Sequence, residues 1–250
     1  MPTYRDTREF ARLREQVAEP ARRRFDELVA EVDLTAANAA EIVHAIADAV
    51  MRTFGAASAE LGALWLRTCA DIAAGELMYA TASDTLHKHV GWALGEVAGG
   101  RMAQPDAKSS MTSKAGECVI SAADETIVGN MPAGTIYTRV AAPGACAFCT
   151  MAAAELKVTK KGDRPHFHDG CRCVTVPATR PDQIAGYERR FDECHGMYER
   201  ARDDLKAGNV PEELKRRIED ARAAHYERTD EPWTSANSIL IVMREQNGIN

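Results

Sequence analysis

The most informative part of the sequence is Cys146-Ala-Phe-Cys149, followed by His166-Phe-His168-Asp-Gly-Cys171-Arg-Cys173. Four of the seven cysteines and two of the seven histidines fall within these 28 residues. A Cys-x-x-Cys pair presents two thiolates to one tetrahedral ion, and a second group of Cys and His residues supplies the other ligands. The pattern predicts a structural zinc ion (Zn2+) bound by Cys146, Cys149 and at least two of His168, Cys171 and Cys173.

The sequence leaves open which of His168, Cys171 and Cys173 complete the ligand set. If Arg172 is extended, Cys171 and Cys173 point to the same side, because residues two apart share a strand face, and the site has four cysteines. If the turn at Gly170 twists the segment, His168 replaces one of them. Zinc in a structural site takes four ligands, so one candidate is left out.

Three other interpretations of the cysteines compete with structural zinc. They could be reduced side chains in an apolar core, although the flanking polar residues argue against this. A redox Cys-x-x-Cys would need a thioredoxin-like βαβ frame, which the flanks do not predict. A catalytic zinc site would need an H-x-E or H-E-x-x-H motif, and the sequence contains neither. We therefore expect a closed site with no catalytic residue, and Asp169 as a surface or outer neighbour of the ligands.

The flanks of the cysteine motif predict a mainly α protein with a small α+β zinc-stabilised module. Residues 1–130 read as long helices, although Pro20 predicts a helix start or kink and residues 101–114 read as a loop. Residues 131–179 hold two β-prone runs, Ile136 to Val140 and Cys171 to Val176, around the cysteines. Residues 180–250 read as charged helices, broken near Gly208 and Pro211, with an apolar last helix from Ser235 to Gln246.

Composition excludes several classes of protein. The chain is 45% hydrophobic and 27% charged, as in ordinary globular proteins, and its 6% aromatic content argues against an all-β fold. The net charge of −6 arises within residues 1–135, which hold 13 basic and 19 acidic residues, so a uniformly basic nucleic-acid coat is excluded. We find no membrane span and no signal peptide, and expect synthesis in a reducing cytoplasm. Cys69, Cys118 and Cys194 are expected to be core or half-buried residues, with no partner near Cys194.

The cysteine motif and the strand before it resemble the core of the Mu F-like minor head proteins of tailed phages, closest to the versions in phages and prophages of actinobacteria. In that family a strand carrying an Arg leads into Cys-x-x-Cys, and His-x-x-Cys-x-Cys follows after an insert. The matching residues lie within 137–177, with Arg139 on the strand and His168, Cys171 and Cys173 in the second element, while His166 is additional.

The resemblance implies a minor capsid or head-morphogenesis protein of the virion, made in the bacterial host cytoplasm. Such a protein is a low-copy component inside the procapsid, associates with the portal and/or the major capsid protein, and holds zinc as a structural staple. The resemblance further suggests self-association through the N-terminal helices and contact with packaged DNA. Alternatives are a zinc-knuckle nuclease, in which His166 or His168 activates water, and a zinc-dependent nucleic-acid-binding module. A salt-sensitive affinity for DNA would favour either alternative.

Overall fold

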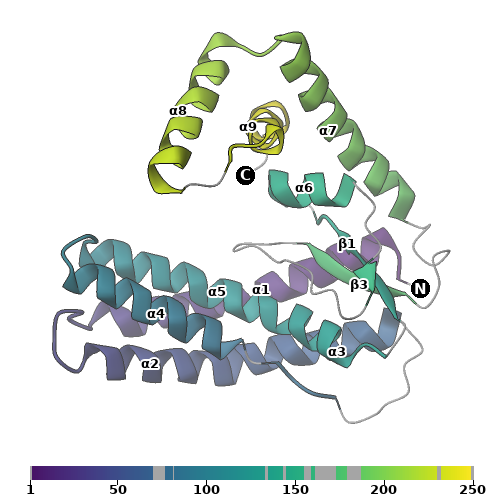
Figure 1. Ribbon diagram of the computed structural model, residues 1–250. Coiled ribbons are helices and arrows are strands. Elements are labelled where there is room, and N and C mark those ends of the chain that lie inside the picture. The colour runs from purple at the N-terminus through teal and green to yellow at the C-terminus, as the bar shows by residue number, and fades with distance from the viewer. Residues whose placement is uncertain are drawn as a thin grey trace.

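The computed structural model describes residues 2–69, 77–80, 82–132, 135–142, 145–154, 159–160, 173–178, 187–229 and 232–248. Within them the protein is built from helices around one small sheet (Figure 1). A bundle of long N-terminal helices lies on one side of the sheet, and the C-terminal helices lie on the other. The expected mainly helical fold is confirmed.

The bundle is formed by helices that lie between Tyr4 and Asn130. Its helices are α1 (Tyr4–Ala30), α2 (Ala39–Val50), α3 (Ala56–Cys69), α4 (Ser83–Ala98) and α5 (Gln104–Asn130). One turn of π-helix, η1 (Met51–Gly55), joins α2 to α3, so these elements form an unbroken helical run. On α1, Ala18, Ala21, Phe25 and Val29 recur every three or four residues and are buried in the bundle core. This spacing places them on one helix face, which is the reason the helix packs there.

The structure departs from two sequence predictions in the bundle. The helix start predicted near Pro20 and the loop predicted at 101–114 are wrong, whereas the kink that was the other expectation for Pro20 stays a prediction. Helix α1 runs through Pro20 without a new start, although proline removes a backbone N–H donor. The neighbouring Ala18 and Ala21 are fully buried in the bundle core. The segment expected to be a loop at 101–114 instead begins helix α5 at Gln104. Pro105 stands in the first turn of α5, where its missing N–H would have had no helical partner.

The sheet has the strand order β2-β1-β3, and both pairings are antiparallel. Its strands are β1 (Ile136–Val140), β2 (Thr159–Lys160) and β3 (Val174–Ala178). The predicted strand at Ile136–Val140 is confirmed, and β3 begins three residues after the predicted start at Cys171. The sheet shares a core with the bundle, in which Tyr137 and Val176 belong to one cluster with Trp65 and Ile127.

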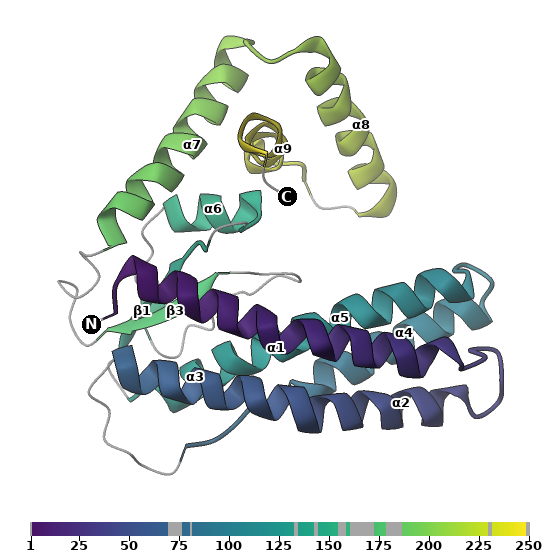
Figure 2. The same cartoon turned by 180° about the vertical axis from the view of Figure 1, so that it is seen from behind.

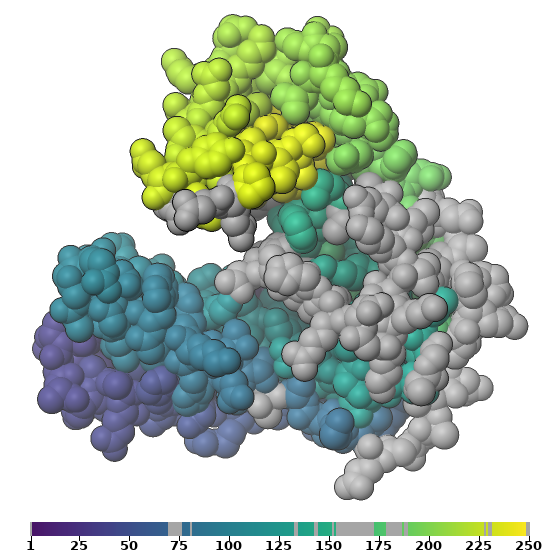
Figure 3. All heavy atoms as spheres, in the orientation of Figure 1, coloured from purple at the N-terminus to yellow at the C-terminus, as the bar shows by residue number. Residues whose placement is uncertain are grey.

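The C-terminal helices form an arch with its own core (Figure 2). Helix α6 (Ala147–Ala154) lies against the sheet, and α7 (Glu188–Ala207), α8 (Glu212–Arg228) and α9 (Ser235–Asn247) follow. Gly208 ends α7 with a positive φ of 74°, which glycine adopts without strain, and confirms the predicted break. Figure 3 shows α9 in yellow between α8 and α6. Among the helices that the structure describes, none is both long and apolar enough to span a membrane.

Candidate metal centre

The Cys-x-x-Cys pair lies at the beginning of helix α6. Cys146 directly precedes the helix and is half-buried, while Cys149 in its first turn is fully buried. The backbone N–H of Cys149 donates to Cys146 Sγ at 3.4 Å, and Thr150 donates through its backbone N–H and its hydroxyl to the Cys146 carbonyl. A sulfur that already accepts a backbone hydrogen bond is held in one orientation, as a metal ligand requires.

Cys173 reaches the same place from the sheet. It lies directly before strand β3 and is 1% exposed. Cys149 and Cys173 belong to one cluster of buried side chains, and Cys146 packs against it. The structure therefore places three of the five predicted ligands in or against one cluster of buried side chains. His168 and Cys171, like His166 and Asp169, lie outside the described residues.

Cys194 is a fourth thiol in this cluster, and sequence analysis did not pair it with the motif. It lies on α7 and is fully buried against the same group of residues. Burial raises the pKa of the Cys194 thiol, Arg190 opposes this shift, and Glu193 adds to it. A signal was present in the sequence, because Tyr187, Phe191, Cys194 and Tyr198 recur every three or four residues and predict one buried helix face.

The residues of this cluster suit a zinc ion in their chemistry. Zinc binds thiolates well, and here the thiols are surrounded by the small side chains of Ala141, Ala145 and Ala153. Within the described ranges, however, no three His, Cys, Asp or Glu side chains come close enough together to hold a metal ion. The complete ligand set therefore stays a prediction.

The bundle holds the segment that carries Cys173 through two buried side chains. Arg14 on α1 donates from Nη2 to the Cys173 carbonyl at 2.8 Å, and its Nη1 pairs with Asp124 on α5. Trp65 on α3 donates from Nε1 to the Thr175 carbonyl at 2.9 Å. The exposed fractions of Arg14 and Asp124 are only 1% and 3%. The sequence did not predict the burial of Arg14 and Asp124, because a charged residue in an amphipathic helix is ordinarily exposed.

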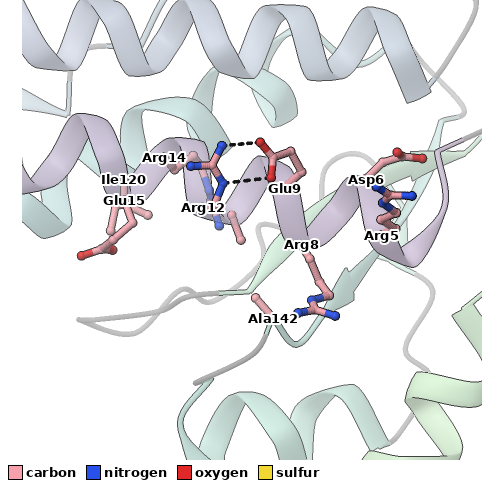
Figure 4. A pocket seen from close by; sticks show the side chains of 10 residues that line it. Arg5, Asp6, Arg8, Glu9, Arg12, Arg14, Glu15, Ile120 and Ala142 are labelled. Carbon is pink, nitrogen blue, oxygen red and sulfur yellow. Dashed lines mark hydrogen bonds and ion pairs between the residues drawn. The ribbon is translucent and has the colours of Figure 1, made fainter.

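A polar groove of about 810 Å3 runs along the first half of α1 (Figure 4). Arg5, Arg8 and Arg12 line it with the buried Arg14, but so do three carboxylates. Asp6 accepts hydrogen bonds from Thr3, Glu9 pairs with Arg12, and Glu15 pairs with Arg22. Because positive and negative groups nearly balance, the groove lacks the excess positive charge typical of a nucleic-acid site.

Comparison with known proteins identifies one family. A family model described as "VG15 protein" matches residues 1–201, which is four fifths of the chain. No curated protein and no solved structure matches the sequence. The matched region contains the bundle, the sheet, the cysteine cluster and most of α7, whereas α8 and α9 lie beyond it.

Proposed function

This chain belongs to the VG15 protein family, which is a phage-type family, and on that premise we propose that it is a structural minor capsid protein of a tailed phage. In this proposal it acts in head morphogenesis, associates with the portal or the inner capsid, and carries one structural zinc ion. It has no catalytic role. Its place is the virion, at the capsid interior or the portal vertex.

The burial of the thiols is the observation that best supports a structural metal. Cys149 and Cys173 are at most 1% exposed, and buried alanines are among their described neighbours. A catalytic zinc needs an open coordination position that substrate and water can reach. A closed, buried group of thiols is instead typical of a metal that stabilises a fold.

In this proposal the metal stabilises a part of the fold whose apolar core is small. Among the residues that the structure describes, the cluster around Cys149 contains only cysteine and alanine, with Tyr198 at its margin, and these side chains bury little apolar area. Zinc binding contributes on the order of 10 kcal/mol to the folding of small zinc domains. In the proposed holoprotein Cys146, Cys149 and Cys173 hold the ion together with residues from the predicted second element, and the ion joins α6 to the sheet.

Metal content tests this part of the proposal. Native mass spectrometry of protein purified without chelator should find one zinc per chain in the wild type and none in the double variant Cys146→Ser, Cys149→Ser. Cys118→Ala is the matched control, because Cys118 is buried in the bundle core and should leave the zinc content unchanged. A wild-type protein free of zinc would refute the structural staple.

The bundle supplies the proposed partner surface. Along α2, Ile42, Ala45, Ile46 and Ala49 line an open groove of about 430 Å3 together with Leu28 of α1. Ile42 is 39% exposed although it is apolar. A partner helix laid into such a groove buries its apolar face, which is a common mode of recognition. We assign this surface to the portal, to the major capsid protein or to a second copy of the chain.

Particle assembly tests the partner surface. When the chain is co-expressed with the portal, scaffold and capsid proteins of its phage, Ala45→Glu should reduce its incorporation into purified procapsids several-fold. Ala98→Glu is the matched control, because Ala98 is also an exposed helical alanine of the bundle but lies outside the groove. Normal incorporation of both variants would argue against the groove. A salt-sensitive DNA affinity without any incorporation would favour the nucleic-acid-binding alternative.

A further inference from the structure

The outer edge of strand β3 is held by the bundle. Among the described strands β3 is the last of the sheet, and one of its edges pairs with β1. The carbonyls of Cys173 and Thr175, two residues apart, accept hydrogen bonds from Arg14 and Trp65, so both face the bundle. Pro177 follows two residues later and has no N–H to present there. Side chains from two helices thus take the place of a neighbouring strand.

Arg14 is fixed in position more firmly than an ordinary surface arginine. Its guanidinium pairs with Asp124 on one side and lies 5.2 Å from the ring centroid of Phe10, which itself stacks on Trp65 at 4.7 Å. The planar guanidinium presents its donors in a rigid fork, so the contact with Asp124 also sets the direction of the Nη2–H bond. That bond ends on the backbone of Cys173, one of the predicted zinc ligands.

We propose that Arg14 is a positioning residue for the metal site, which couples packing of the bundle to the affinity for zinc. By holding the Cys173 carbonyl, Arg14 sets the backbone from which the Cys173 thiolate reaches the ion. Groups that orient metal ligands from outside typically change metal affinity 10- to 100-fold when they are removed. This inference rests on the proposed function, because it takes Cys173 to be a ligand.

The coupling is reciprocal. If the Arg14 contact favours zinc binding, then bound zinc stabilises the arrangement of α1, α5 and β3 by the same free energy. A partner that bound the bundle and displaced α1 from α5 would therefore weaken zinc binding in a module to which it makes no contact. Arg14 pairs with Asp124 inside the bundle and donates to the Cys173 carbonyl beside the sheet, so its guanidinium is a physical link between the two regions.

Zinc affinity of Arg14→Lys is the primary test. A lysine ammonium can still pair with Asp124, so the variant should fold, but a single point charge cannot hold both acceptors in the geometry of the fork. Competition with a chromophoric chelator should show zinc bound about 10-fold more weakly than in the wild type. Arg14→Met should bind it up to about 100-fold more weakly, and the matched control Arg12→Met, which removes an exposed arginine paired with Glu9, should bind it as the wild type does.

Cobalt substitution separates positioning from general destabilisation. The visible absorption of a cobalt–thiolate site depends on ligand geometry, so Arg14→Lys should shift these bands while the metal-free protein keeps its helical circular dichroism. Trp65→Phe serves as a second variant if Arg14→Met fails to fold, because it removes the bond to Thr175 but keeps an aromatic ring beside Phe10. A smaller loss of zinc affinity than in Arg14→Lys is expected for it.

The outcomes distinguish the inference from the function on which it rests. Wild-type protein that binds no zinc would overturn both the structural metal and the role of Arg14. Wild-type protein that binds zinc, with Arg14→Lys unchanged in affinity and in cobalt spectrum, would overturn the positioning role alone. Equal weakening by Arg12→Met and Arg14→Met would also overturn it, because a general effect of positive charge would then explain both.

Discussion

At the scale of the residue, Gly62 marks the closest approach of two helices. A Cβ atom at this position of α3 would lie 2.4 Å from the Ala123 carbonyl oxygen on α5 and 2.9 Å from its Cα. These are backbone atoms in a packed helix, so they cannot move aside without shifting α5. The absent side chain is therefore what allows α3 and α5 to pack.

Gly62→Ala should lower the free energy of unfolding by about 1–3 kcal/mol, because a methyl group forced into a packed interface displaces its neighbours. Gly91→Ala is the matched control. Gly91 is also helical and has no atom within 4 Å of the added Cβ, so alanine there should stabilise the protein by about 0.5–1 kcal/mol. Urea unfolding measures both values. Equal changes in the two variants would contradict the close packing of α3 on α5.

Some residues of the cysteine cluster were predicted from the sequence and others were not. Cys146, Cys149 and Cys173 were identified from their spacing, and the structure places them in one cluster. Cys194 and Arg14 were not, because each meets the cluster through contacts that no local pattern records. Arg14 is 159 residues from Cys173 in the sequence. The role of all five predicted ligands in binding metal stays a prediction.

At the scale of the element, α2 and α4 meet through a stacked pair of histidines. The rings of His44 and His87 lie 4.6 Å apart at an angle of 6°, and His87 Nε2 lies 2.8 Å from Asp48 Oδ1. Burial, and then the neighbouring His87, hold the pKa of His44 below its ordinary value, while Asp48 opposes the shift. Within the described residues, the buried Nδ1 of His44 has no hydrogen-bond partner.

The histidine pair should make the bundle less stable in acid. The pKa of His44 is lower in the folded protein than its ordinary value of 6.5. As the pH falls below 6.5 the unfolded chain therefore takes up the proton first, and protonation favours unfolding until the folded-state pKa is passed. His44→Gln should lose less stability than the wild type between pH 7.5 and pH 5, as followed by urea midpoints. The same loss in both proteins would show that other groups control the acid response.

The last helix tests whether the C-terminal core is a true core. Helix α9 contains five consecutive apolar residues, from Ile239 to Met243. Ile239, Val242 and Met243 are buried among residues of α6, α7 and α8. Met243→Ala should cost about 2–5 kcal/mol through the cavity that it leaves. Arg244→Ala, at the exposed next position, should stay within about 0.5 kcal/mol of the wild type. Thermal unfolding compares them, and equal melting temperatures would contradict this packing.

The sequence predicted element boundaries correctly where nearby residues mark them. Examples are the end of α7 at Gly208 and the strand Ile136–Val140. The observed boundaries differ from the predicted ones at Pro20 and at Pro105. A proline in the first turn of a helix and a loop proline look alike in sequence, so Pro105 was assigned to a loop. Pro20 was expected to start or kink a helix, because sequence does not show how much apolar surface the flanking turns bury in the bundle.

At the scale of the whole molecule, separate cores should respond differently to loss of metal. The bundle core lies among α1, α2, α4 and α5, and of the predicted ligands that the structure describes, Cys146, Cys149 and Cys173, it contains none. Treatment with a strong chelator should therefore lower the melting temperature and loosen the region around α6, while most far-ultraviolet helical signal remains. The double variant Cys146→Ser, Cys149→Ser should be insensitive to chelator. Collapse of the helical signal, or no response in the wild type, would contradict this prediction.

The three-part division of the chain at residues 130 and 180 stays a prediction at this scale. The sheet shares one apolar core with the bundle through Trp65 and Tyr137, and a second, cysteine-lined cluster with α6 and α7. It therefore contacts the regions on both sides of it. Melting of the chelated protein in one or two steps will show whether these regions unfold as separate units.

The order of helices, the first strand, the cysteine pairs and the apolar last helix could all be read from the chain, because periodicity, turn residues and ligand spacing are local properties. The sequence did not show which helix and sheet surfaces pack against each other. The burial of Arg14 against Asp124, the entry of Cys194 into the thiol cluster and the capping of β3 by the bundle join residues far apart in sequence. Such contacts depend on how whole helix faces fit together, and packing of that kind arises only when all the elements are in place.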